Sequence, residues 1–546
     1  MSACRVLCTL AILISAPPVG YAVAQQPSTP PSLILTGGKI FTADTARPWA
    51  EAVSIRGERI VAVGTNDAIR RSAGPRTRVI DVGGRVVIPG INDSHDHVGN
   101  VAMPGEFATG ASPTPDPTFP KVLDSIRAMA ARTPRGTWIK TSIGLRVLDD
   151  TAARRAALDR VTVDHPVFLW AWWGHGSVLN SAALRALGIA ERAPDPLGGW
   201  YERDAAGQLT GRLDEYAEWG AMRRLYSMQP EHVLLAGLRA FADSSVRLGV
   251  TTVQDMAGDL EPRVMLRVMH DANLPIRMRL IRWSIPDLGG RNEREWNVAN
   301  VHPAPRVEVS GRKWVLDGTP IERNALRRTP YAGAPTAAGR HGRLDFPLDT
   351  VGAILSAALL PHAPQLHLHI VGDSTSALVV ALMGSLAPDS VWRTKRVRFE
   401  HADGLVGAAA VQRARELGIV ASQPRDGRPL ETWSSAGIPL AYGSDGLRNP
   451  FYNMMAALGA GRTGSAEALT REQAVTMYTR GSAYAEFAET EKGTIAPGML
   501  ADIAVLSQDI FTIPLPALPG TTSVLTIVGG RIVRDVLPWI VARPMQ

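Results

Sequence analysis

Cysteine is almost absent from this sequence of 546 residues, and its two copies, Cys4 and Cys8, stand at the N-terminus. The rest of the chain can therefore form neither a disulfide framework nor a thiolate metal site. Any metal ion must be held by histidine, carboxylate or modified side chains. Lysine is also scarce, with 6 copies among 58 basic residues, so a lysine on an apolar strand is an informative residue.

Blocks of like charge and long apolar runs are missing as well. The 58 basic and 51 acidic residues give a formal net charge of +7, and the chain lacks the clustered basic residues that bind nucleic acid. Beyond the N-terminus, no stretch approaches the ~18 continuous apolar residues of a membrane-spanning helix. With 45% hydrophobic and 20% charged residues, the sequence predicts a large folded core, no nucleic-acid partner and no stable membrane anchor.

Residues 1–24 are predicted to be a secretory signal peptide. Arg5 precedes an apolar stretch over residues 6–16, and small residues follow at positions 22–24, which is the order of a cleavable signal. An uncleaved anchor is the alternative. We therefore expect the mature protein to be periplasmic or secreted and free of cysteine.

Short β-branched runs cut by glycine-containing turns occur at both ends of the chain, over residues 33–87 and 486–540. They predict the two parts of one small β-sandwich built from both termini. Between them, residues 88–485 alternate apolar strands with helical stretches such as 230–249 and 406–418. This alternation predicts an α/β fold, a (β/α)8 barrel of the TIM type.

Nine apolar segments are candidates for the barrel strands. They are VVIPGIND, TWIKTSIG, PVFLWAWW, GVTTVQDM, KWVLDG, QLHLHIVGD, RVRFEHA, IVASQP and PLAYGSD. The region is longer than the ~250 residues that such a barrel needs, so it must contain insertions. Residues 104–120 and 190–230 are the candidate insertions, either as lids over a site or as surface decoration.

Several candidate strands end in histidine or charged residues, and barrel enzymes place their catalytic groups at these ends. His95 and His97 are two residues apart, so on an extended chain both can reach one metal ion, although such pairs are also common without one. Lys313 lies on an apolar strand, where burying a lysine costs free energy, so a functional role is one interpretation. Its amine could form a carbamate that bridges two metals, which arginine cannot do; an exposed lysine at the strand rim is the alternative.

Three later strand ends complete the pattern. His367 and His369 share one strand face, so spacing leaves open which of them is a ligand. His401 and Asp445 follow the next strands, where a hydrogen-bonded core histidine and a turn-forming aspartate are the ordinary interpretations. The order H-x-H, Lys, His, His, Asp on successive strand ends is more specific than any single member.

With these motifs the sequence resembles the amidohydrolase superfamily, and within it the YtcJ-like metal-dependent hydrolases called amidohydrolase family 3. The resemblance covers nearly the whole mature chain. Its motifs include PGINDSHDH, HPVFLWAWWGHGSVLNSAALRALGI, KWVLDG, the H-x-x-G-D at 369–373, the R-x-E-H-A at 398–402, and GSD at 443–445. The H-x-x-G-D match favours His369 over His367 as a ligand.

The resemblance implies a centre of one or two divalent metal ions, with zinc the expected element. The implied metal ligands are His95, His97, Lys313 as a carbamylated bridge, His369, His401 and Asp445. Asp445 and His401 are also the implied catalytic residues, for proton transfer and for stabilising the oxyanion. Members usually carry an acid where this chain has Gly174, so the family's pocket role at this position does not carry over, although His175 is kept. His175, Arg323 and Trp173 are the predicted substrate contacts.

The predicted function is an exported hydrolase that cleaves an amide-type C–N bond of a small molecule (N-acyl, N-formyl or cyclic amide) with a metal-activated hydroxide. The alternatives are an ester or lactone hydrolase, or a deaminase, on the same centre. A third is an exported binding protein that has the barrel but no turnover. Whether the chain forms a homo-oligomer is left open.

Overall fold

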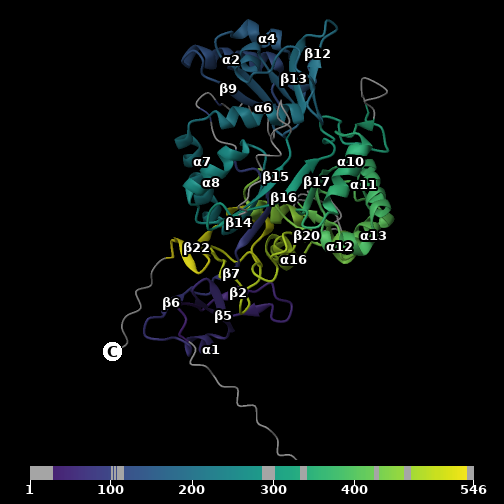
Figure 1. Cartoon of the computed structure of the whole chain (residues 1–546). Helices are drawn as coiled ribbons and strands as arrows, with labels where there is room; N and C mark the ends of the chain where they lie inside the picture. The colour runs from purple at the N-terminus through teal and green to yellow at the C-terminus, as the bar shows by residue number, and fades with distance from the viewer. Residues whose placement is uncertain are drawn as a thin grey trace, which may run out of the picture.

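The computed structural model describes residues 29–99, 103, 106, 116–285, 302–332, 341–422, 430–459 and 469–537. The predicted signal peptide with both cysteines, most of the proposed insertion at 104–120 and the end of the IVASQP segment lie outside the described residues. Figure 1 shows a central barrel with a small β domain at one end and an inserted α/β layer at the other.

Eight parallel strands form the barrel, in the order β20-β19-β18-β17-β16-β15-β14-β8. Their bounds are β8 Ile91–Asp96, β14 Val250–Ala257, β15 Arg277–Trp283, β16 Val307–Val315, β17 Leu366–Ile370, β18 Arg398–His401, β19 Val420–Ser422 and β20 Leu440–Ala441. The two edges meet, because Ser94 N donates to Tyr442 O (3.0 Å) and Ser444 N donates to His95 O (3.1 Å). The predicted TIM-like barrel is therefore confirmed.

Helices surround the barrel (Figure 1). They are α7 Glu231–Arg247, α8 Pro262–Ala272, α10 Leu348–Ala358, α11 Asp373–Leu386, α12 Asp389–Lys395, α13 Ala408–Leu417, α14 Leu430–Ser435, α15 Pro450–Ala457, α16 Arg471–Thr476 and the short α17 Ser482–Tyr484. The helices predicted within 230–249 and 406–418 are confirmed as α7 and α13. Among the described residues, no single helix is long and apolar enough to cross a membrane; α11 and α12 pass that test only as a pair bent by 114°.

Two of the predicted barrel strands belong elsewhere. The segments at 137–144 and 166–173 form β9 (Ile139–Ile143) and β10 (Val167–Ala171), which lie in a separate five-stranded sheet of order β12-β13-β11-β10-β9. The strand that sequence reasoning missed is β15, because arginines interrupt its apolar pattern. One of them, Arg279, points into the polar barrel interior, where it binds Ser310 and Gln365.

The inserted layer contains this sheet and the helices beside it. Its other elements are α2 Phe119–Arg132, α3 Leu145–Leu148, α4 Arg155–Val161, β11 Ser177–Leu179, α5 Ser181–Ala186, β12 Gly199–Arg203, β13 Leu209–Glu215 and α6 Tyr216–Ser227. The predicted insertion at 190–230 is thus part of a larger one. Because the ring of His175, just before β11, lies 5.3 Å from the ring of His369 at the end of β17, the insert covers the C-terminal ends of the barrel strands.

Both termini contribute to the small β domain, as predicted. A four-stranded sheet has the order β5-β4-β1-β6 and a six-stranded sheet the order β23-β22-β21-β7-β2-β3. The strands are β1 Leu33–Thr36, β2 Lys39–Phe41, β3 Trp49–Ala50, β4 Ala52–Arg56, β5 Arg59–Gly64, β6 Arg78–Asp81, β7 Val86–Pro89, β21 Ile503–Leu506, β22 Ser523–Val528 and β23 Arg531–Asp535, with helix α1 Asn66–Arg70 beside them. Asp502 pairs with Arg277 at the start of β15 (2.8 Å), so this domain packs at the N-terminal end of the barrel.

The VVIPGIND segment is shared between two domains. Its first half is β7 in the small domain, and its second half begins β8 in the barrel. Gly90 makes the junction, because a Cβ there would lie 2.2 Å from Thr251 Oγ1. The close approach of the Thr251 side chain to the backbone of Gly90 therefore leaves no room for a larger residue at this position.

Candidate metal centre

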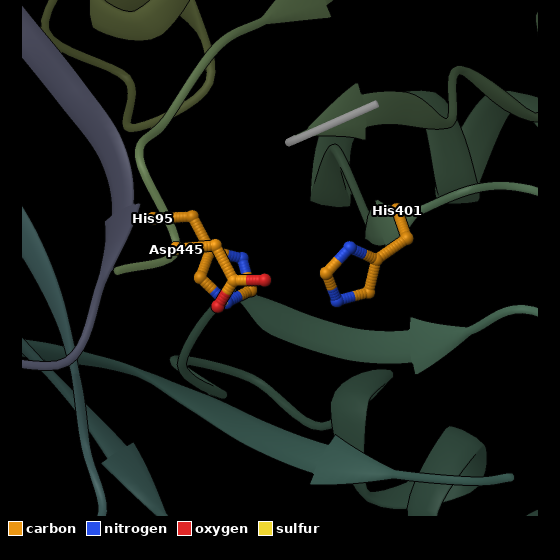
Figure 2. Close-up of side chains that lie close together, drawn as sticks. All are labelled: His95, His401 and Asp445. Carbon is orange, nitrogen blue, oxygen red and sulfur yellow. The ribbon is translucent and has the colours of Figure 1, made fainter. Parts of the chain in front are cut away.

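His95, His97 and Asp445 meet at the C-terminal end of the barrel. His95 lies on β8 and His97 follows it, and their Nε2 atoms are 3.6 and 3.5 Å from Asp445 Oδ1. His401, at the end of β18, lies opposite His95 and Asp445 (Figure 2), and one ligand atom from each of these three residues lies within 4.8 Å of the others. Asp96, between the two histidines, turns away and accepts from Arg448 Nε (3.0 Å).

Burial keeps His95 neutral. The pKa of its ring is lowered to about 4, first by desolvation and then by the charge of Lys313. A neutral imidazole whose Nδ1 donates to Glu400 Oε2 (2.7 Å) leaves the Nε2 lone pair directed at Asp445. This is the state that binds a metal ion.

Lys313 is buried beside these residues. Its side chain is 2% exposed, and its Nζ lies 3.3 Å from His95 Nε2 and 4.6 Å from the centre of the Trp283 ring. Burial lowers the pKa of the amine to about 8. The alternative of an exposed lysine at the strand rim is therefore wrong.

His369 completes the group. Its ring lies 4.5 Å from that of His401, and burial followed by the charge of His401 holds the pKa of His369 well below its ordinary range. Its Nε2 is buried and has no hydrogen-bond partner among the described residues. An orphaned imidazole nitrogen amid imidazole and carboxylate donors fits a bound divalent metal ion.

His367 has a different environment, although it shares a strand face with His369. Its Nδ1 binds Glu400 Oε1 (3.0 Å), and a Cβ on Gly311 would lie 2.8 Å from its Nε2. The structure therefore places His367 deeper in the barrel, against β16 and β18. This arrangement is consistent with the choice of His369 as the ligand.

A second cluster of buried residues, His175, Glu215 and Glu322, adjoins His369. One ligand atom from each lies within 4.8 Å of the others, and His175 Nδ1 binds Glu215 Oε2 (2.8 Å). Although burial opposes the charged ring, Glu215, Glu322 and Glu218 raise the pKa of His175 to about 9. A cationic imidazole thus lies among carboxylates, beside the ring of His369, whose pKa is lowered by burial.

The two other predicted substrate contacts are engaged by acidic partners. Trp173 Nε1 donates to Glu322 Oε2 (2.7 Å). Arg323 binds Asp149 through two hydrogen bonds of 3.0 and 2.7 Å. Trp173 therefore adjoins the second cluster, whereas Arg323 lies at a half-exposed ion pair.

Four of these residues have a strained backbone. Positive φ angles occur at Glu215 (54°), Arg323 (66°), His401 (70°) and Asp445 (45°). Such angles are unfavourable for residues with a Cβ and persist where the surrounding structure enforces them, commonly at functional sites.

Sequence reasoning missed the carboxylates that hold the histidines. Glu400 could have been predicted from the alternation of β18. This alternation places Arg398 and Glu400 on one face, next to His367 and His369 of β17. Glu215 and Glu322 carried no such signal, because their meeting with His175 depends on how the insert packs on the barrel.

Known proteins resemble the chain over most of its length. Residues 78–534 match the model of the amidohydrolase family. The protein YtcJ of Bacillus subtilis (strain 168) is 26% identical across 91% of this chain and 98% of its own. The N-substituted formamide deformylase of Arthrobacter pascens is 31% identical, and this match spans 39% of the chain and 42% of the deformylase.

Solved structures share the fold. A metal-dependent hydrolase from Pyrococcus furiosus, itself uncharacterized, superposes with a TM-score of 0.65 at 21% identity, over 88% of this chain and all (100%) of that one. A triazine hydrolase variant gives a TM-score of 0.51 at 17% identity, over 93% and 96% of the two chains.

Proposed function

The chain belongs to the amidohydrolase family, and from this premise we propose that it is an exported metal-dependent hydrolase that cleaves an amide-type C–N bond of a small molecule. The observation that carries the proposal is the group of mutually close donors His95, His401 and Asp445, of which both histidines are buried, with the orphaned Nε2 of His369 beside them. Export to the periplasm or outside the cell rests on the N-terminal segment alone.

The donor set fits a divalent metal. His95, His97 and Asp445 would hold one ion, and His369 and His401 a second. Imidazole and carboxylate donors without thiolate suit zinc, our proposed element, and also Mn²⁺, Fe²⁺ or Co²⁺. When bound, the metal makes water nucleophilic at neutral pH.

Lys313 is proposed to supply an anionic bridge. Its amine adds to carbon dioxide, so that an N–C bond forms and a proton is released to solvent, and the resulting carbamate offers two oxygen ligands. The support is its position, buried and 3.3 Å from His95 Nε2. Arginine, which the chain prefers elsewhere, cannot undergo this reaction.

Different residues of the chain are proposed to transfer the proton, stabilise the oxyanion and contact the substrate. Asp445 takes the proton from the attacking water and passes it to the leaving amine. Where no second ion is bound at His369 and His401, His401 donates toward the oxyanion. His175, whose Nδ1 is held by Glu215, presents its other edge to the substrate, while Trp173 and Arg323 shape the pocket through Glu322 and Asp149.

The C–N bond is preferred because a relative is named as a deformylase of N-substituted formamides. Ester or lactone hydrolysis and deamination remain alternatives on the same donor set. A binding protein without turnover is less consistent with the structure, since all six predicted ligand positions carry donor side chains.

Hydrolysis of N-formyl and N-acyl amines, with elemental analysis of the same samples, tests the proposal. We expect bound divalent metal and equimolar release of carboxylate and amine by the parent. Asp445→Asn should lower kcat by ~10²–10⁴-fold, whereas Asp509→Asn, which removes a carboxylate paired with Lys39 in the small domain, should not. Ammonia release from amino-substituted rings would indicate a deaminase, cleavage of esters alone an esterase, and a protein that binds no metal would contradict the proposal.

A further inference from the structure

Glu400 is fully buried in the barrel and touches three other side chains. Its Oε2 accepts from His95 Nδ1 (2.7 Å) and its Oε1 accepts from His367 Nδ1 (3.0 Å). Arg398, two residues earlier on β18, contacts both oxygens, through Nη2 (3.2 Å) and Nε (2.9 Å). All four side chains are 0% exposed, so no water competes for these contacts.

The position of Glu400 determines which face of His95 is available. A carboxylate only accepts hydrogen bonds, so the contact at 2.7 Å places the ring proton on His95 Nδ1. The lone pair is then on Nε2, which lies 3.3 Å from Lys313 Nζ and 3.6 Å from Asp445 Oδ1. Rotation of the ring would break the bond to Glu400.

His367 and Arg398 fix Glu400 in turn. Arg398 also binds Ser94 O (2.6 Å), Ser422 Oγ (2.7 Å) and Gln254, so its guanidinium joins β8, β14, β18 and β19. His367 reaches the remaining oxygen from β17. His367, the first histidine of the L-H-L-H strand, therefore has a role of its own, two residues before His369.

We propose that Glu400 is a positioning residue that sets the tautomer and orientation of His95 for metal binding, and that His367 holds Glu400 for this purpose. The inference rests on the metal centre of the proposed function, but it does not depend on which bond is cleaved. Arg398 balances the charge of the carboxylate, so the group carries no net charge in the barrel interior when both histidines are neutral.

The test is the affinity of the full chain for Zn²⁺ after metal removal, measured by competition with a chelator. Glu400→Gln keeps the size of the side chain but replaces one acceptor by a donor, so it cannot accept from both rings. We expect its affinity to fall by ~10–100-fold. His367→Gln should cause a smaller loss, because Arg398 still holds Glu400.

Asp502→Asn is the matched control. Asp502 is also buried and paired with an arginine, Arg277, but at the opposite end of the barrel, so its replacement should reduce stability and leave Zn²⁺ affinity unchanged. Saturation with Co²⁺ adds a readout that a merely structural role would not move. The absorption bands of bound Co²⁺ should shift in Glu400→Gln and stay as in the parent in Asp502→Asn.

The outcomes separate the two hypotheses. A folded Glu400→Gln protein with parental Zn²⁺ affinity and parental Co²⁺ bands would overturn the positioning role alone. Should Glu400→Gln fail to fold, parental affinity in His367→Gln would overturn it. A parent protein that binds neither ion would overturn the inference together with the proposed function, whereas binding without any hydrolysis would leave the inference to be decided by the variants.

Discussion

Two clusters of histidine and carboxylate lie side by side in this protein. In the first, the metal centre with His95 and Glu400, the histidine ring is neutral; in the second, with His175 and Glu215, it is protonated. Burial lowers the pKa of His95 to about 4, whereas carboxylates raise the pKa of His175 to about 9 against the same effect. The difference is the local balance of charge. Glu400 serves two histidines and is balanced by Arg398, whereas Glu215, Glu322 and Glu218 surround one histidine.

This difference separates two chemical roles. Neutral rings offer lone pairs, so the first cluster suits a cation. A protonated ring offers N–H donors, so the second suits an oxygen atom of a substrate. Because the rings of His175 and His369 are 5.3 Å apart, one small molecule could contact both.

We expect the largest effect from replacing Lys313, which belongs to the first cluster and has no counterpart in the second. Lys313→Ala should lower both the metal content and kcat/KM, the latter by more than ~10²-fold, because a bridging ligand is lost. Lys313→Arg is the matched control that keeps a cation but cannot form a carbamate, and it should behave like the alanine variant. Elemental analysis with bicarbonate in the medium checks this; full activity of Lys313→Arg would show that no carbamate is needed.

The second prediction concerns the cationic state of His175. Its pKa is raised from 6.5 to about 9 on folding, so the ring binds its proton more tightly in the folded protein. The stabilisation is complete below pH 6.5 and is lost as the pH rises through 9, and it amounts to at most ~3 kcal/mol.

Urea unfolding of metal-free parent and His175→Gln measures this effect. The stability difference between the two proteins should be larger below pH 6.5 than above pH 9. His232, on the exposed start of α7, supplies the control substitution to glutamine, which should show no such change. A constant difference across the range would mean that folding leaves the pKa of His175 unchanged, and a difference that grows above pH 6.5 would mean that the ring is neutral in the folded protein.

A smaller effect is expected when Glu215, which binds His175 Nδ1, is replaced. Glu215→Gln keeps the shape of the side chain but weakens the hold on His175, so kcat/KM should fall by ~10-fold, about the value of one hydrogen bond to a charged group. Metal content should stay at the parental value, because the side-chain hydrogen bonds of Glu215 go to His175 and Asn324. Loss of metal in this variant would show that the two clusters act as a single site.

The two clusters also differ in how far the sequence predicts them. The first comes from strands that run in register, so residues such as His95, His369 and Asp445 meet at one barrel end by topology alone. The second requires an insert to pack on the barrel, and the alternation of β9 and β10 does not distinguish an insert sheet from barrel strands. Likewise, β15 was missed because Arg279 is stabilised by partners on other strands, which no local pattern reveals.

The smallest expected effect is at Arg323, where a resemblance suggested a substrate contact and the structure shows an ion pair. Its bonds to Asp149 are half-exposed, and such pairs contribute at most ~1 kcal/mol. Arg323→Ala should therefore change KM by less than ~5-fold, with Asp149→Asn giving a similar change. Steady-state kinetics on a neutral and an anionic N-acyl amine test whether Arg323 contacts the substrate. A direct contact would raise KM for the anionic compound alone. It would do so in Arg323→Ala but not in Asp149→Asn.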